Sequence, residues 1–191
     1  MYLFFVVALF TVCHSYVLND VMEKKLRDRN SAFHDSQNYA RFASLLFKIF
    51  VSLIDSAGTK WCGPGDTADN YEDLGVAEAE DRCCRQHDYC PDTIVSGETK
   101  HNLTNDSSYT KLSCECDEIF RQCLRQAASV NSKTIGTVYF NVIGTQCFRR
   151  DYPVTGCLKK GGWLMSKCVK YSYDKKGKKL HQWFDVPNYY D

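Results

Sequence analysis

The stretch "RCCRQHDYC" (Arg82–Cys90) decides the fold, because three cysteines, a histidine and an aspartate crowd into one short segment. The surrounding "AEDRCCRQHDYC" has the spacing of a helix, on which Cys83, His87 and Cys90 share one face. Adjacent helical residues project about 100° apart, so His87 and Asp88 face different neighbours. The segment therefore predicts two separate contacts for one helix.

A second helix is predicted at "SCECDEIFRQCLRQAA" (Ser113–Ala128), since Ser113 followed by acidic residues is a typical helix start. Cys116, Phe120 and Cys123 again share one face. In an antiparallel pair of helices, facing positions have a nearly constant sum of residue numbers. The pairs that match are Cys83 with Cys123, Cys90 with Cys116, and His87 with Asp117.

The pair of His87 and Asp117 predicts chemistry. A carboxylate on one ring nitrogen fixes the tautomer of an imidazole and leaves the other nitrogen free to accept a proton. Because the cysteines allow many connectivities, this helix pairing is a hypothesis. The plainer interpretation of His87 is a buried histidine that only satisfies the core.

Asp88 lies on the stripe of Cys84 and needs a partner of its own. The loop "TKWCGPGD" (Thr59–Asp66) is a candidate, because its glycines let backbone groups approach a ligand without interfering side chains. A disulfide from Cys62 to Cys84 would hold this loop beside Asp88. Backbone carbonyls and one carboxylate make an all-oxygen site, which a hard cation such as calcium prefers. A carboxylate on a solvated helix face is the plainer interpretation.

Zinc is the rival ligand for a cluster of cysteines and histidine. The spacing CysCys-x2-His-x2-Cys lacks two separated chelating pairs, and disulfides would consume the thiolates of a secreted protein. The pattern therefore disfavours zinc.

Composition places the chain among secreted globular proteins. It has 191 residues, 25% charged and 44% hydrophobic, and its 11 cysteines point to the oxidising secretory route. A net charge of +1 implies no nucleic acid or other polyanion as partner. The apolar run Tyr2–Val12 has signal-peptide length. Cleavage near Ser15 would remove Cys13 and leave an even number of cysteines.

These features divide the chain into a signal peptide at 1–15, an N-terminal extension or pro-segment at 16–58, and a cysteine-rich domain at 59–191. The extension contains "RFASLLFKIFVSLID" (Arg41–Asp55), which is too short to span a bilayer. A pro-segment or a helix packed on the domain is favoured over an interfacial anchor, since amphipathic apolar stretches are usually core.

Near the end, "KCVKYSYDKKGKKLHQWFD" (Lys167–Asp185) alternates on both sides of "DKKGKK" and predicts a β-hairpin. The expected fold class is therefore α+β, with two main helices and a small hairpin. The lysines at its tip fit either an anionic lipid surface, with Trp163 entering the interface, or simple solubility. Asn102 and Asn105 begin two glycosylation sequons in one turn-rich loop.

Several short motifs occur in the order and approximate spacing of one known family, and they are "WCGPG", "CCRQHDYCPD", "SGETKHNLTN", "LSCECDEIF", "YFN", "PVTGC" and "QWFD". On these motifs the sequence resembles the group III secreted phospholipases A2, typified by the bee-venom enzyme. The resemblance covers about Lys60 to Phe184. It implies a disulfide-rich phospholipase A2 fold with two antiparallel disulfide-linked helices, an N-terminal calcium loop and a small C-terminal β-hairpin.

The resemblance also implies an activity, the calcium-dependent hydrolysis of the sn-2 ester of glycerophospholipids to a free fatty acid and a lysophospholipid. The enzyme would be a secreted, extracellular monomer acting at a phospholipid membrane or micelle surface. His87 would be the general base and Asp117 its orienting partner, with Tyr139 hydrogen-bonded to Asp117. The Gly63 amide would stabilise the oxyanion, and the calcium ligands would be the carbonyls of Trp61, Gly63 and Gly65 and the carboxylate of Asp88.

The family's disulfide pattern transfers to this chain as Cys62–Cys84, Cys83–Cys123, Cys90–Cys116, Cys114–Cys147 and Cys157–Cys168. The alternative function is a catalytically silent phospholipase-like toxin or receptor ligand on the same scaffold. The histidine, its carboxylate and the calcium ligands are what separates the two, and all are present here. A purely structural disulfide domain would leave the loop of Gly63 and Gly65 unexplained.

Overall fold

The computed structural model describes residues 58–63, 65–162 and 167–190. The predicted signal peptide, the apolar segment Arg41–Asp55 and Trp163 lie outside these residues. Among the helices that are described, none combines the length and the apolarity needed to cross a membrane. The described chain mixes helices with short strands and is cross-linked by disulfides, which agrees with the expected α+β class.

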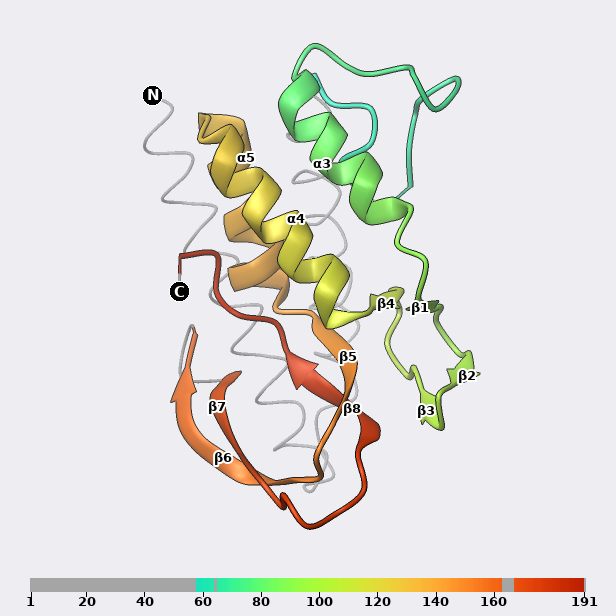
Figure 1. Ribbon diagram of the computed structural model, residues 1–191. Helices are drawn as coiled ribbons and strands as arrows, with labels where there is room; N and C mark the ends of the chain where they lie inside the picture. The colour runs from blue at the N-terminus through green and yellow to red at the C-terminus, as the bar shows by residue number, and fades with distance from the viewer. Residues whose placement is uncertain (1–57, 64, 163–166, 191) are drawn as a thin grey trace, which may run out of the picture. The chain divides into compact units, whose positions relative to one another are not determined.

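Two helices lie side by side, α3 (Glu78–Asp88) and α4 (Cys114–Ala127) (Figure 1). α4 begins after Ser113, whose hydroxyl accepts a hydrogen bond from the Cys116 amide at 3.3 Å, as the sequence predicts. α3 has no side-chain cap, but acidic residues in its first turn favour the positive end of the helix dipole. It ends at Asp88, two residues before the predicted end.

Two disulfides join these helices along their length. Cys83 of α3 bonds Cys123 near the end of α4, and their Cα atoms are 5.6 Å apart. Cys90, just after α3, bonds Cys116 at the start of α4, with Cα atoms 5.9 Å apart. Early residues of one helix therefore meet late residues of the other, and the helices run antiparallel.

The chain continues from α4 into helical segments that the hydrophobic pattern did not predict, α5 (Val130–Gly136) and the π-helix η1 (Thr137–Ile143). The Ser129 hydroxyl caps α5 by accepting a backbone amide bond at 2.9 Å. Gly136 allows the Tyr189 ring to pack on α5, because a Cβ there would lie 2.3 Å from a ring carbon. These segments bring the chain back against the helix pair.

The C-terminal strands form two antiparallel ladders, β5 (Gln146–Asp151) with β8 (Leu180–Asp185), and β6 (Val154–Gly161) with β7 (Lys167–Tyr173). The predicted hairpin Lys167–Asp185 is therefore wrong in its pairing, because its two strands belong to different ladders. Alternation identifies a strand but does not identify its partner. The Cys157–Cys168 disulfide holds β6 to β7, with Cα atoms 5.7 Å apart.

The core lies between the helices and the β5–β8 ladder. Cys114 bonds Cys147, which ties the start of α4 to β5 with Cα atoms 4.9 Å apart. The large side chains with almost no exposed surface are Ile94, Leu124, Phe140, Phe148, Phe184, Val186 and Tyr189. These apolar side chains pack against the buried face of α4.

The segment between α3 and α4 is folded into four short strands rather than an open loop. β1 (Thr93–Ile94) pairs with β4 (Lys111–Leu112), and β2 (Thr99–Lys100) pairs with β3 (Leu103–Thr104). His101 and Asn102 form the turn between β2 and β3, with φ of 56° and 61°. Two positive φ values in a two-residue turn suit the twist of a tight hairpin.

The structure corrects the choice of Asn105 as a glycosylation candidate, because this residue has no exposed surface. Its amide nitrogen donates to the carbonyls of Ile94 and Tyr109, both at 2.8 Å, and its oxygen accepts from the Ser107 amide at 3.0 Å. A glycan on this nitrogen would break a buried hydrogen-bond network. Asn102, in contrast, is exposed at the hairpin turn.

Candidate active site

The structure brings His87 and Asp117 together across the helix pair. His87 Nε2 lies 2.9 Å from Asp117 Oδ1, and both side chains are buried, at 9% and 1% exposure. A carboxylate accepts from an N–H, so this contact places the imidazole proton on Nε2. Nδ1 is then the nitrogen with a lone pair, and it can take a proton.

Tyr139 and Phe120 hold this pair in position. The Tyr139 hydroxyl donates to the same Asp117 oxygen at 2.8 Å. Burial and then the Asp117 carboxylate raise the pKa of Tyr139 well above its usual value, so the hydroxyl keeps its proton. The His87 ring stacks on Phe120 with centroids 4.3 Å apart and meets the Tyr139 ring edge-on at 5.1 Å. The imidazole therefore has little freedom to rotate.

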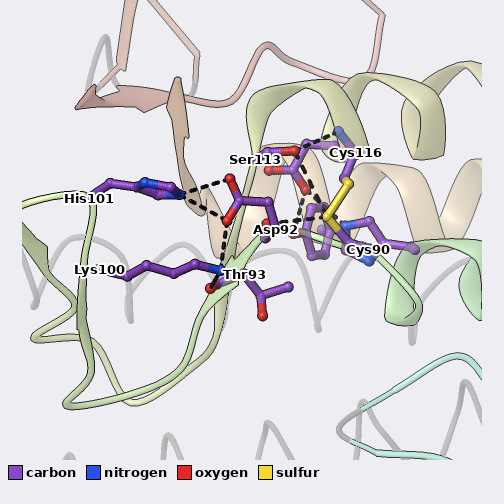
Figure 2. Close-up of a disulfide and its surroundings, with 10 residues drawn as sticks. Cys90, Asp92, Thr93, Lys100, His101, Ser113 and Cys116 are labelled. Carbon is purple, nitrogen blue, oxygen red and sulfur yellow. Dashed lines mark hydrogen bonds and ion pairs between the residues drawn. A yellow bond between two sulfur atoms is a disulfide. The ribbon is translucent and has the colours of Figure 1, made fainter. Parts of the chain in front are cut away.

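All cysteines near His87 in the sequence form disulfides. Figure 2 shows the Cys90–Cys116 bond beside Ser113, where the end of α3 meets the start of α4. Cys83 and Cys84 are also in disulfides, with Cys123 and Cys62. All five observed pairs are those that the family resemblance implies. No thiolate is left near His87 among these residues, which removes the donors that a zinc site would need.

The glycine loop lies against the other face of α3. Cys62 bonds Cys84 with Cα atoms 5.1 Å apart, so the loop is tied to the helix face that carries Asp88. Gly63 and Gly65 have φ of 143° and 88°, a region that side-chain-bearing residues rarely adopt. Trp61, just before them, is 5% exposed. Trp61 thus anchors the loop in the protein, while Gly63 and Gly65 expose backbone groups without side chains.

Asp88 makes no hydrogen bond or ion pair with any described residue. The residue as a whole is exposed to solvent, but its carboxyl group is partly buried by surrounding protein atoms. This partial burial raises the pKa of Asp88 to about 6, an effect that His87 opposes and Asp66 and Asp81 reinforce. The ionised form of Asp88 is therefore partly desolvated and has no described cation beside it, which a bound cation would relieve.

Asp81 is a residue of this site that the sequence pattern missed. It has no exposed surface. Its carboxylate accepts from the backbone amides of Lys60 at 2.9 Å, Trp61 at 2.8 Å and Gly75 at 2.6 Å. These bonds hold the start of the glycine loop to α3. In the sequence, Asp81 looked like one more acidic residue of a first helical turn.

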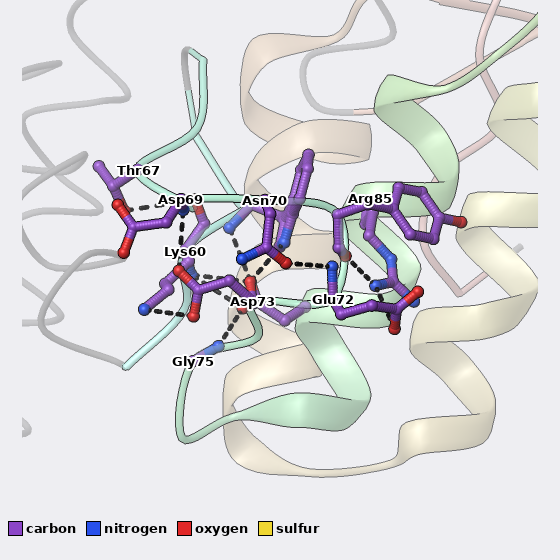
Figure 3. A network of polar contacts seen from close by, with 11 residues as sticks. Lys60, Thr67, Asp69, Asn70, Glu72, Asp73, Gly75 and Arg85 are labelled. Carbon is purple, nitrogen blue, oxygen red and sulfur yellow. Dashed lines mark hydrogen bonds and ion pairs between the residues drawn. The ribbon is translucent and has the colours of Figure 1, made fainter.

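The segment after the glycine loop adds a second layer of polar contacts (Figure 3). Lys60 Nζ lies 2.6 Å from Asp73 Oδ1, and the Trp61 ring donates to the Asp73 carbonyl at 2.9 Å. The Arg85 guanidinium of α3 donates to the Tyr71 carbonyl and lies 4.0 Å from the centre of the Tyr71 ring. Residues 67–75 therefore brace the glycine loop from outside.

The available donors fit calcium better than a transition metal. Among the described residues, no group of three or more His, Cys, Asp or Glu side chains could hold a metal. Backbone carbonyls of the glycine loop together with the unpaired Asp88 carboxylate would offer a cation oxygen atoms only. Hard cations with flexible coordination accept such a set.

A buried imidazole with one nitrogen left for a proton, on a helix to which a glycine loop is tied, is an arrangement typical of hydrolases. Comparison with known proteins gives the family. A family model for Phospholipase A2 matches residues 55–151, just over half of the chain. The chain belongs to the group III phospholipase A2 family.

The relatives are similar over about two thirds of this chain. A phospholipase A2 from Xylocopa aruana is 50% identical over 129 residues, which are 68% of this chain and 70% of the relative. One from Bombus terrestris is 48% identical over 134 residues, covering 69% of this chain and 97% of the relative. One from Apis mellifera is 44% identical over 133 residues, covering 69% and 78%.

Proposed function

We propose that this protein is a secreted, calcium-dependent phospholipase A2 that hydrolyses the sn-2 ester of glycerophospholipids. The products are a free fatty acid and a lysophospholipid. The observation that carries the proposal is the 2.9 Å contact of His87 Nε2 with buried Asp117, on the helix to which the Cys62–Cys84 disulfide ties the glycine loop. Relatives named phospholipase A2, at 44–50% identity, support the reaction class.

His87 acts as the general base. Asp117 and Tyr139 hold the ring, so Nδ1 faces the substrate and takes a proton from a water molecule. The oxygen of that water attacks the sn-2 carbonyl carbon, and the carbonyl electrons move to its oxygen. When the ester bond breaks, the imidazolium returns its proton to the leaving glycerol oxygen. No covalent acyl-enzyme is needed.

Calcium would be held by the carbonyls of Trp61, Gly63 and Gly65 and by the carboxylate of Asp88. When bound, it supplies positive charge beside the developing oxyanion. The Gly63 amide donates a hydrogen bond to that same oxyanion. Asp81 positions these groups, because it fixes the amides of Lys60 and Trp61 on the inner side of the loop.

A phospholipid membrane or micelle surface is the proposed partner of a monomeric enzyme. Tyr71 and Tyr89 are 48% and 60% exposed beside Trp61, and the Tyr71 and Tyr89 rings meet edge-on at 5.0 Å. Exposed aromatic rings near a lipid-hydrolysing site suit the interfacial region of a bilayer. Nothing in the net charge of +1 favours nucleic acid.

The proposed maturation route is removal of a signal peptide at 1–15, with residues 16–58 as an extension or pro-segment and 59–191 as the catalytic domain. The five disulfides suit folding in an oxidising compartment and an extracellular location. Asn102 is the proposed glycosylation site. N-terminal sequencing of the secreted protein, together with peptide mapping of glycans, tests both points.

Fatty acid release from mixed phospholipid vesicles, with and without chelator, tests the function. The proposal predicts release that stops in chelator and returns when calcium is added in excess. Release that continues unchanged in chelator would contradict the calcium mechanism. Release of the sn-1 chain instead of the sn-2 chain would contradict the reaction class.

A further inference from the structure

A second concave site lies beside the turn of the β2–β3 hairpin and uses none of the residues assigned to catalysis or to calcium. It is a groove of about 540 Å³, between the hairpin turn and strands β5 and β8. Its ionisable and amide lining includes His101, Asn102, Arg150, Lys179 and His181, and none of the described residues that line it is acidic. We call it the histidine groove. Its volume is that of a site for a small organic ligand.

One wall of the histidine groove is held firmly. Asp92 accepts from His101 Nε2 at 2.9 Å and forms an ion pair with Lys100 Nζ at 2.8 Å (Figure 2). The His101 ring then stacks on the His181 ring of β8, with centroids 4.1 Å apart and planes 19° apart. The Phe148 ring also packs on His101, with ring centroids 5.5 Å apart. The tight hairpin turn is therefore fixed against the β5–β8 ladder.

The histidine groove also carries basic groups that have no acidic partner among the described residues. Arg150 is paired with His181 in the β5–β8 ladder, and its guanidinium makes no hydrogen bond or ion pair with the residues that the structure describes. The adjacent Arg149, in contrast, donates to Asp151 at 3.3 Å and to the Tyr173 hydroxyl at 2.9 Å. The Lys179 amine is 4.9 Å from the Tyr152 ring centre, a weak contact that leaves its donors available.

The carboxylates near the histidine groove are already neutralised by other cations. Asp92 is shared by Lys100 and His101, and Asp151 is paired with Arg149. Partial burial and then the His101 ring lower the pKa of His181; Asp92 opposes this shift and Arg150 adds to it. The groove therefore has a surplus of positive potential that no described side chain compensates.

We propose that the histidine groove binds an organic ester of phosphate or sulfate. Arg150 presents a planar fork of donors that matches two oxygens of a tetrahedral anion, and Lys179 adds a point charge. His181 donates to a third oxygen. Leu180, which is 47% exposed, and Trp183 provide an apolar surface for the organic part. The proposal depends on neither His87 nor calcium.

Imidazole NMR of the intact protein in calcium-free buffer tests the proposal, with glycerol 3-phosphate and glucose 6-sulfate as probes. Signals of His101 and His181 should shift and saturate, while the His87 signal should stay unchanged. Arg150→Gln should weaken binding about tenfold or more, since it removes charge-assisted hydrogen bonds. Lys179→Gln should weaken it less. Lys133→Gln, which removes an exposed lysine of α5, is the matched control and should change nothing.

Sedimentation with vesicles separates the two sources of such an ester. If Arg150→Gln reduces binding to phosphatidylglycerol vesicles and Lys133→Gln does not, the ligand is a lipid headgroup. Equal sedimentation of both variants, with the NMR shifts intact, assigns a soluble ester. Shifts that do not saturate, that equal concentrations of sodium chloride abolish, or that persist unchanged in Arg150→Gln would overturn the proposal.

Discussion

The two halves of the candidate site are held by different kinds of structure. The imidazole half lies between two helices that are joined by the Cys83–Cys123 and Cys90–Cys116 disulfides, and its side chains are almost fully buried. The loop half is tied by one disulfide and otherwise by hydrogen bonds, and its glycines are exposed. A general base must keep one geometry toward its substrate. A loop that binds a cation must instead let the cation exchange water for protein oxygens. Covalent bonds suit the first requirement and polar bonds suit the second.

Substitution of the base should give the largest effect. His87→Gln keeps a side chain of similar size against Phe120, so the fold should persist. Turnover should fall by about 100-fold to 10,000-fold, because an amide cannot act as the general base. The measurement is fatty acid release from vesicles, with circular dichroism as the control for folding. A folded His87→Gln variant with ordinary turnover would remove His87 from the mechanism.

Asp88→Asn should break the loop half and leave the imidazole half intact. The variant loses the only charged ligand proposed for calcium, so calorimetry should detect no saturable calcium binding. Turnover should fall with it, while the contact between His87 and Asp117 should stay unchanged. An imidazole NMR spectrum like that of the parent protein checks this point. Calcium affinity equal to that of the parent would contradict the ligand assignment.

Asp81→Asn should sharpen the comparison, because it weakens the support of the loop without removing a proposed calcium ligand. One oxygen remains for the amides of Lys60 and Trp61, but the new amide faces the Gly75 N–H. Calcium affinity should fall by about tenfold to a hundredfold, as for supporting residues of metal sites.

Asn105→Ala is the matched control for Asp81→Asn. It also removes buried hydrogen bonds, to Ile94 and Tyr109, but away from the glycine loop. Both variants should lose about 1–3 kcal/mol of the free energy of unfolding. Only Asp81→Asn should lose calcium affinity. Equal calcium affinities in the two variants would show that Asp81 stabilises the fold in general and does not support the calcium loop in particular.

Tyr139→Phe should give the smallest effect. It removes one donor from Asp117, which keeps its bond to His87, and the ring contact with His87 remains. Turnover should fall by less than about tenfold, and the free energy of unfolding by about 1–2 kcal/mol. Steady-state kinetics and chemical denaturation measure the two effects. A loss as large as that of His87→Gln would make Tyr139 part of the chemistry.

Local spacing predicted the contacts that lie within or between the two main helices. The cap at Ser113 and the approach of His87 to Asp117 follow from helical periodicity and from the constant sum of facing positions. The disulfide pairs agree with the family pattern. Such features depend on neighbours along one or two regular elements.

Features set by distant neighbours escaped prediction. Alternation around the lysine-rich turn marked β7 and β8 as strands, but their partners, β6 and β5, come from elsewhere in the chain. Asn105 looks like an open sequon until carbonyls from Ile94 and Tyr109 bury it. Asp81 looks like a charge on a helix surface until the amides of the glycine loop reach it. Burial of a polar group is a tertiary property.

Calcium titration of the His87→Gln variant by calorimetry tests most directly the claim that base and cation are held by independent structures. The parent protein and the variant should bind calcium with the same affinity and stoichiometry, although the variant turns over almost no substrate. A variant that folds but no longer binds calcium would contradict the claim, because the two halves would then depend on one another.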